Sequence, residues 1–229
     1  MNPTGARLDH LVVLAASLDE GMAWSEALLG VTPKAGGEHP LMGTHNLLLR
    51  IADPQVPAFS RSYLEILAIR PGATPTRRPP LKRWFDLDDE EIQARLRQQG
   101  PRLLHWVASA PDAGSTAAQW LAQGLDRGPL LQASRPSPTG LLQWQITVRD
   151  DGRRLLEGTL PTLIQWGPRH PVDTLPDCGL RLERFSLSHP DPAPLSSALH
   201  SLGLPLPLTS APAGLQAVLT TPRGVVTLS

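Results

Sequence analysis

The sequence predicts an α+β fold in which repeated βαβββ modules form an open, curled, mixed sheet with helices on the outside. Three short apolar runs are typical of buried strands, and they are 8–13, 103–108 and 182–187. A helical pattern that ends at a glycine follows each run. The offsets are 20 residues from His10 to Gly30, 19 from His105 to Gly124 and 19 from Arg184 to Gly203. So regular an offset indicates an internal repeat.

Each helical pattern carries a start signal and a stop signal. Ser17-Leu18-Asp19-Glu20 fits a capping box, in which a hydroxyl and a carboxylate bind free backbone amides. Asp112 precedes the second helical pattern, and Asp191-Pro192 precedes the third. The terminal glycines suit the left-handed conformation that ends many helices. The sequence therefore predicts three capped helices, one in each unit.

Strand-like runs follow each terminal glycine, so each unit has the order strand–helix–strand–strand–strand. The expected strands are 31–36, 44–51 and 62–69, then 128–135, 141–149 and 160–166, then 204–209, 215–221 and 224–228. We divide the chain into a first module at 1–70, a linker with a short helix at 71–101, a second module at 102–170 and a third, shortened module at 180–229. The basic linker residues Arg77, Arg78, Lys82 and Arg83 are expected to be solvated, with phosphate binding as the alternative.

Composition excludes several classes of protein. The 229 residues are 41% hydrophobic, which is enough for a packed core, and 21 basic residues balance 21 acidic ones. A nucleic-acid partner normally requires a basic excess. The single cysteine, Cys178, excludes an internal disulfide framework and cysteine-rich zinc sites. Without a signal peptide or a long apolar run, we expect a cytoplasmic protein with no membrane partner.

Two histidines occupy matching places in the first two units. His10 lies in the first strand of one unit, and His105 lies at the corresponding place in the next. The last strands of these units carry Glu65 and Gln165, at offsets of 55 and 60 residues from the respective histidines. Two nitrogen and two oxygen ligands suit a divalent ion such as zinc, nickel, iron, manganese or cobalt. The alternative is that the histidines are hydrogen-bonded core residues.

Common nucleotide-binding and hydrolase motifs are absent. The sequence contains no G-x-x-x-x-G-K-[ST], G-x-G-x-x-G, G-x-S-x-G or H-E-x-x-H pattern. Nucleotide-dependent chemistry and the common serine hydrolase mechanisms therefore gain no support from the sequence.

The chain resembles the glyoxalase-like domain family of the vicinal oxygen chelate (glyoxalase/bleomycin resistance/dioxygenase) superfamily. The segments that carry the resemblance are Leu8-Asp9-His10-Leu11-Val12, Gly43-Thr44-His45-Asn46, Tyr63-Leu64-Glu65-Ile66-Leu67 and Leu160-Pro161-Thr162-Leu163-Ile164-Gln165-Trp166. The resemblance spans about residues 7–170. It implies paired βαβββ modules around a cavity, and a divalent metal held by residues of the first and last strands of each module.

Carried onto this sequence, the family's metal ligands would be His10, Glu65, His105 and Gln165. The resemblance implies a metal-dependent lyase, isomerase or dioxygenase that chelates vicinal oxygens of a small molecule. Glu65 would be the catalytic base. Gln165 departs from the glutamate that is common at this place, and Arg184 leaves the third module without a ligand. The alternative is a non-catalytic protein that binds small molecules in the same cavity.

Strand alternation predicts which side chains share the cavity with the metal. We expect Leu8 and Val12 beside His10, and Tyr63 beside Glu65. The expected substrate-binding residues are Asn46, Arg50, Tyr63, Gln145 and Thr147. The fixed charge of Arg50 favours an anionic substrate, unless Arg50 pairs with Asp53. The expected partner is a small-molecule substrate, and a homodimer is left open.

Overall fold

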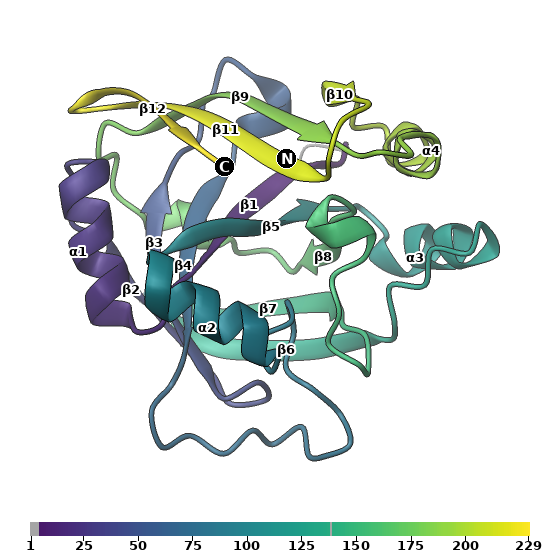
Figure 1. The fold of residues 1–229 in the computed structure, drawn as a ribbon, viewed down its shortest axis with the longest axis horizontal. Helices are drawn as coiled ribbons and strands as arrows, with labels where there is room; N and C mark the ends of the chain where they lie inside the picture. Colours follow the sequence, from purple (N-terminus) through teal and green to yellow (C-terminus); the bar gives the residue numbers. More distant parts are fainter. Residues whose placement is uncertain (1–4, 138) are drawn as a thin grey trace.

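The computed structural model describes residues 5–137 and 139–229, which form two sheets and four α-helices (Figure 1). The large sheet holds β1 (Arg7–Leu14), β2 (Lys34–His39), β3 (Thr44–Arg50), β4 (Tyr63–Ile69), β5 (Arg102–Ser109), β6 (Leu130–Ser137), β7 (Gly140–Thr147) and β8 (Thr162–Trp166). The small sheet holds β9 (Arg181–Ser188), β10 (Leu208–Thr209), β11 (Gly214–Thr221) and β12 (Gly224–Leu228). The helices are α1 (Leu18–Leu28), α2 (Glu90–Gln99), α3 (Ala113–Ala122) and α4 (Ala193–Leu202).

The large sheet consists of two similar halves that meet at its centre. Its strand order is β2-β3-β4-β1-β5-β8-β7-β6. In each half the last strand lies parallel to the first, as β4 does to β1 and β8 to β5. The halves are joined by the antiparallel pair β1–β5, in which Leu11 lies opposite Trp106. A two-fold rotation about this pair places His10 and His105 in equivalent positions. The predicted α+β class with a curled, mixed sheet is confirmed.

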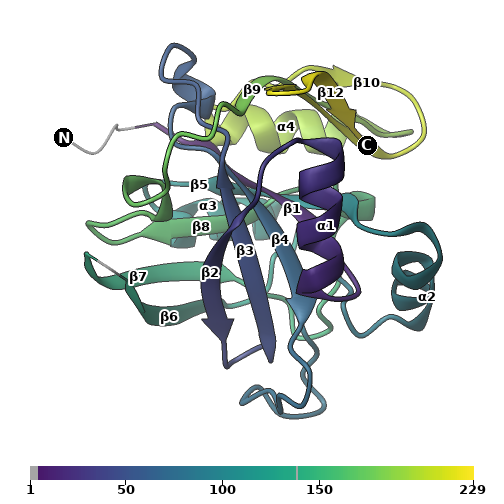
Figure 2. The same ribbon diagram turned by 90° about the vertical axis from the view of Figure 1, so that its left-hand side faces the viewer.

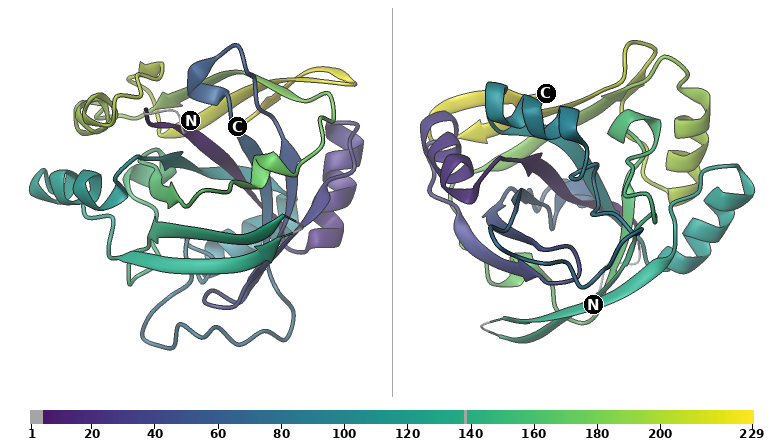
Figure 3. Two further views of the ribbon diagram at one scale, coloured as in Figure 1. Left: turned by 180° about the vertical axis from the view of Figure 1, so that it is seen from behind. Right: turned by 60° about the horizontal axis from the view of Figure 1, so that its bottom comes forward.

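The sheet curls until its two edge strands approach each other (Figure 2; Figure 3, right). Arg135 on β6 reaches across to β2, where its Nη1 donates to the carbonyl oxygen of Gly36 at 2.6 Å. A Cβ on Gly37 would lie 2.9 Å from that Nη1, and a Cβ on Gly36 would lie 2.1 Å from the Asn46 side-chain oxygen. The Gly36-Gly37 pair therefore makes room for the contact that nearly closes the sheet.

Two of the three predicted helix caps form, whereas α4 begins after Pro192 without a side-chain cap hydrogen bond. Ser17 accepts a hydrogen bond from the amide of Glu20 at 3.2 Å, and Asp112 accepts one from the amide of Ser115 at 2.8 Å. Each cap replaces a partner that the first helical turn cannot supply. Gly203 follows α4 with a φ of 70°, the left-handed conformation that favours glycine.

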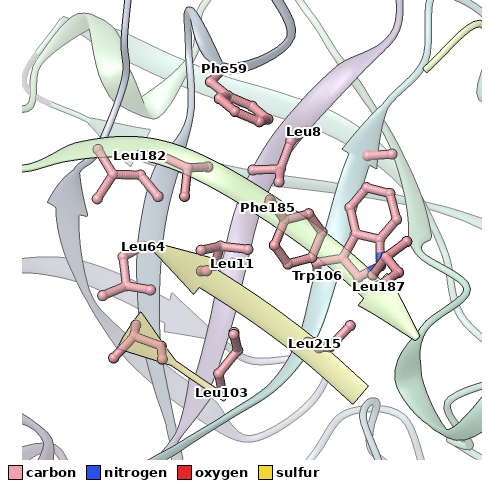
Figure 4. Packing of buried hydrophobic residues seen from close by; sticks show 14 of the residues in the cluster. Leu8, Leu11, Phe59, Leu64, Leu103, Trp106, Leu182, Phe185, Leu187 and Leu215 are labelled. Carbon is pink, nitrogen blue, oxygen red and sulfur yellow. The ribbon is translucent and has the colours of Figure 1, made fainter. Parts of the chain in front are cut away.

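Residues 181–228 have the strand–helix–strand–strand–strand order, but their sheet is separate from the large one. Its order is β10-β9-β11-β12, with the two-residue strand β10 parallel to β9 and β11 antiparallel to it. In the other two units, by contrast, the last strand lies beside the first. The small sheet covers the outer face of β1 and β5, where the Phe185 ring meets the Trp106 ring edge-on at 5.2 Å (Figure 4). This third unit extends the core without adding strands to the curl.

The connection between β4 and α2 enters the interior instead of remaining solvated. Trp84 and Phe85 stack at 5.2 Å and are 8% and 4% exposed. Asp86 anchors this segment to the second half of the sheet, since its Oδ2 accepts a hydrogen bond from Arg154 Nε at 2.8 Å. Phe85 and Asp86 have φ values of 60° and 58°, which cost L-residues about 1–2 kcal/mol each. Arg77, expected to be solvated, is buried and bound to Asp150 at 2.9 Å.

Among the residues that the structure describes, no helix is both long enough and apolar enough to cross a membrane.

We predict that Gly21→Ala destabilises the fold by about 1–3 kcal/mol, the range for overpacking a core. Gly21 lies on α1 against β4, and a Cβ there would stand 2.4 Å from Ile66 Cγ2. Urea unfolding of Gly21→Ala, of Ile66→Leu and of the double variant measures the coupling free energy between the two positions. Leucine lacks the Cγ2 methyl group that obstructs the added Cβ.

Gly114→Ala on α3 is the matched control. Its Cβ would meet Asp112 Oδ1 and Leu130 Cδ2 at 3.5 and 3.8 Å, so its stability should be unchanged or slightly higher. Equal destabilisation of both variants would contradict this account of the α1 packing.

Candidate active site

A bulge in β1 turns two neighbouring polar residues into the interior. The register of β1 against β5 shifts between Leu8 and His10, so strict alternation fails there. Asp9 and His10 are both buried, and Asp9 Oδ1 accepts from His10 Nδ1 at 2.8 Å. Leu8 instead joins Leu11 in the outer core, which corrects its expected place beside His10. Val12 lies in the inner cluster as expected.

Asp9 is held as a carboxylate by three donors. Besides His10, it accepts from Trp166 Nε1 at 2.9 Å and from His170 Nε2 at 3.1 Å. Burial acts to raise the pKa of Asp9, but the charge of His170 and the hydrogen bonds from His10 and His170 hold it below its usual range. Because Nδ1 of His10 donates to this carboxylate, Nε2 is the ring nitrogen left to act in the interior.

Glu65 faces that nitrogen from β4. Its Oε2 lies 3.5 Å from His10 Nε2, and its Oε1 accepts from Asn46 Nδ2 at 2.5 Å. Asn46 is fixed in turn, because its side-chain oxygen accepts from the Gly37 amide at 2.8 Å. The Tyr63 ring stacks on His10 at 4.6 Å, and burial raises the pKa of its phenol well above the usual value. Asn46 therefore fixes one carboxylate oxygen of Glu65, and the other oxygen faces His10 Nε2.

These groups surround a small cavity of about 30 Å³. Its walls come from both halves of the sheet and from the inserted linker, and they are His10, His39, Asn46, Leu48, Tyr63, Glu65, Trp84, Phe85, Arg135, Trp144, Ile146, Ile164, Trp166 and Pro171. A cavity of this size holds one or two waters.

The equivalent centre of the second half is locked by internal hydrogen bonds. His105 Nδ1 donates to the Gly158 carbonyl at 3.0 Å, and its Nε2 lies 3.0 Å from Thr162 Oγ1. Since that oxygen also accepts from Arg127 Nη2, the hydroxyl proton goes to His105 Nε2. Burial, with the charges of Arg127 and Arg154, lowers the pKa of His105 well below its usual value. His105 is therefore neutral, and both its ring nitrogens are engaged.

Strand register assigns Thr162, rather than Gln165, to the position equivalent to Glu65. Glu65 lies beside Val12 of β1, and Thr162 lies beside Val107, the equivalent residue of β5. Gln165 points to the opposite face of β8, where its Oε1 accepts from the Ala113 amide at the start of α3 at 3.0 Å. The similar offsets of 55 and 60 residues misled the expectation, since the equivalent pair His105 and Thr162 is 57 residues apart.

The structure does not bring the four predicted metal ligands together. His10 and Glu65 meet, while His105 and Gln165 are each bound to other groups. In residues 5–137 and 139–229, no group of three or more His, Cys, Asp or Glu side chains is arranged to hold a metal ion. Two donors do not make the four-ligand set expected for a divalent ion, so these residues do not fit it.

Of the expected substrate-binding residues, Asn46 and Tyr63 line the cavity, and the other three lie elsewhere. Arg50 Nη1 donates to the Val172 carbonyl at 3.5 Å, and Thr147 Oγ1 accepts from the Leu163 amide at 3.0 Å. Gln145 pairs with Gln165 in the β7–β8 register. On β7 the apolar residues, including Trp144 and Ile146, face the cavity, so the polar residues face away from it.

Sequence reasoning missed four side chains of this centre. The sequence did not indicate Asp9, because strand alternation places it on the other face of the strand from His10. Only the bulge brings the two side chains to the same face. His39, His170 and Arg135 are brought in by the curl of the sheet and by the loop after β8. A signal for Arg135 did exist in the Gly36-Gly37 pair, which marks a close approach to a backbone.

Fold and site together define a two-module βαβββ protein with a buried polar centre between its modules. The family described as "Glyoxalase-like domain" matches residues 8–203, and the chain belongs to this family. Among curated proteins, no sequence matches the chain.

A solved structure with a TM-score above 0.5 shows the same kind of fold. A hypothetical protein from Staphylococcus aureus is 12% identical, with a TM-score of 0.56, and the match covers 97% of this chain and 84% of that one. A methylmalonyl-CoA epimerase from Streptomyces coelicolor is 19% identical over 69% of this chain and 96% of that one, with a TM-score of 0.40. The methylmalonyl-CoA epimerase from Mycobacterium tuberculosis is 17% identical over 76% of this chain and 96% of that one, with a TM-score of 0.38.

We predict that the fold loses stability in mild acid because two histidines are buried in neutral form. Burial lowers the pKa of His39 to about 4 and that of His105 well below its usual value. Below about pH 6.5 the unfolded chain binds protons that the folded chain does not, which costs about 1.4 kcal/mol per pH unit and proton. Urea unfolding between pH 7 and pH 5 measures this slope.

His105→Gln should make the slope shallower, and His200→Gln, a change on the exposed side of α4, should leave it unaltered. An unaltered slope in His105→Gln would show that His105 is protonated in the folded protein.

Proposed function

We propose that the protein is an enzyme of the glyoxalase-like family that moves a proton on a small oxygenated molecule, with His10 and Glu65 as the acid–base pair. The observation that carries the proposal is the orientation of His10. Asp9 holds its Nδ1, and its Nε2 lies 3.5 Å from Glu65 Oε2 in the buried interior. A carboxylate that fixes a histidine tautomer is a common device of general acid–base catalysis.

Each neighbour limits what the pair can do. Tyr63 stacks on the His10 ring and prevents its rotation, while Asn46 holds one oxygen of Glu65. The other oxygen and His10 Nε2 lie 3.5 Å apart, so a substrate C–H or O–H group placed beside both could pass its proton to either. Positioned proton transfer of this kind contributes about 10²–10⁴-fold to a rate.

The positive charge in this cavity belongs to Arg135, since Arg50 lies outside it. Arg135 lines the cavity together with His10 and Glu65, although it comes from the opposite edge of the sheet. A guanidinium beside the acid–base pair would stabilise the oxyanion that forms when a carbonyl compound loses a neighbouring proton. No step of this proposal passes through a metal, because His105 and Gln165 are engaged elsewhere.

Substrate entry requires the inserted aromatic pair to move. The cavity of about 30 Å³ has room for one or two waters and is too small for a carbonyl substrate. Trp84 and Phe85 form part of its wall. The strained backbone at Phe85 and Asp86 lowers the cost of leaving this position. When the pair returns over a bound substrate, it excludes water from the acid–base centre.

The second candidate function is non-catalytic binding of a small molecule. It is favoured by the locked state of His105, which shows that one of two equivalent centres holds only structural hydrogen bonds. Catalysis separates the two candidates, because a binding protein needs the cavity but no proton transfer.

We predict that the protein catalyses exchange of the carbon-bound hydrogens next to a carbonyl with solvent deuterium. Pyruvate, 2-oxobutyrate and dihydroxyacetone serve as probes, and ¹H NMR follows the loss of signal in D₂O. His10→Gln and Glu65→Gln should each lower the rate at least about 100-fold, the loss expected for removing a general acid or base. Treatment with a chelator should leave the wild-type rate unchanged.

Gln145→Ala is the control, since its side chain lies on the face of β7 opposite Trp144 and Ile146. It should exchange protons at the wild-type rate. If the wild type exchanges none of the three probes, or if Glu65→Gln is as active as the wild type, the acid–base proposal fails and the binding function replaces it.

A further inference from the structure

A groove of about 220 Å³ opens at the seam where β2 and β6 approach each other. Glu38 and His39 of β2 form one side, and Gln132, Ala133 and Ser134 of β6 form the other. The groove shares four lining side chains with the interior cavity, and they are His39, Trp84, Trp144 and Ile146. It therefore lies directly outside the acid–base centre, on the side from which Arg135 crosses the seam.

One polar group between groove and cavity lacks a partner. Trp84 Nε1 is buried and makes no hydrogen bond within the described part of the chain. A buried indole N–H without an acceptor destabilises the protein, and a ligand oxygen that accepts from it would remove this cost. The Trp84 side chain lines both spaces, so a ligand that occupies both would contact it.

The remaining walls of the groove are largely apolar. Pro40, Leu41 and Met42 follow β2, and Trp144 and Ile146 project from β7. Glu38 at the rim is paired with Arg70, whose Nε lies 3.1 Å from Glu38 Oε1, so this carboxylate does not oppose an incoming anion. Walls of this composition suit a flat hydrocarbon group better than a sugar or a nucleotide.

We propose that groove and cavity together bind a small carboxylate with a flat apolar body, the carboxylate facing Arg135 and Trp84 Nε1 and the body lying in the groove. This inference rests on the proposed function and names the substrate class of that same site. Arg135 supplies the charge that an anion needs beside Asp9 and Glu65. Its bond to Gly36 holds the guanidinium at the seam, where the groove and the cavity meet.

Binding of three simple probes tests the proposal. Phenylacetate has both features, phenylacetamide lacks the charge, and acetate lacks the apolar body. Isothermal titration calorimetry of the wild type should show phenylacetate binding at least tenfold more tightly than either of the others. Equal affinities for phenylacetate and phenylacetamide would contradict the requirement for a carboxylate. Equal affinities for phenylacetate and acetate would contradict binding of the apolar body in the groove.

Variants then assign the residues. Arg135→Gln should abolish the preference for phenylacetate over phenylacetamide, whereas Arg50→Gln, a matched change outside the cavity, should retain it. Trp84→Phe keeps a ring but loses the N–H, so it should weaken phenylacetate binding about threefold to tenfold. Retention of the preference in Arg135→Gln, or its loss in Arg50→Gln, would overturn the assignment to Arg135.

Binding of the probes is measured separately from catalysis. Glu65→Gln should bind phenylacetate at least as tightly as the wild type, because it removes a negative charge from the cavity wall. Probe discrimination without deuterium exchange would leave the ligand class standing and reject the acid–base pair. Exchange without probe discrimination would do the reverse. The wild-type probe series decides the proposal even if Arg135→Gln does not fold.

Discussion

The antiparallel pairing of β1 with β5 is the constraint on which the rest of the structure depends. It joins the two halves of the large sheet and brings His10 and His105 to equivalent positions on its inner face. Its outer face supplies Leu11 and Trp106 to the core that the small sheet covers. The bulge beside His10 adds Asp9 to the interior, so one pair of strands sets both the core and the proposed acid–base centre.

The two halves share a backbone plan but have opposite electrostatic character. The first half buries the carboxylates of Asp9 and Glu65 near His10, and donors from Trp166, His170 and Asn46 satisfy them. The second half buries the guanidinium of Arg127 near His105 and Thr162, where burial lowers the arginine pKa to about 9. Because both ring nitrogens of His105 are hydrogen-bonded, the proposed chemistry uses only the first centre.

The inserted linker connects the proposed catalysis with the proposed ligand class. Trp84 and Phe85 reduce the interior to a cavity of about 30 Å³, and Trp84 also lines the groove outside it. An apolar group in that groove would lie against the same ring that covers the acid–base centre. Binding energy from a remote part of a substrate can be used in this way to position and desolvate the reacting part.

The sequence alone determined the order of strands and helices, two of the helix caps and the strands that carry His10 and Glu65, because each follows from local pattern or from repeat spacing. It could not determine partners across the sheet. The bulge that turns in Asp9, the register that gives Thr162 the place expected for Gln165, and the curl that replaces Arg50 by Arg135 are all tertiary effects. A shift of one residue in a strand exchanges its two faces, and only packing against neighbouring strands decides which face turns inward.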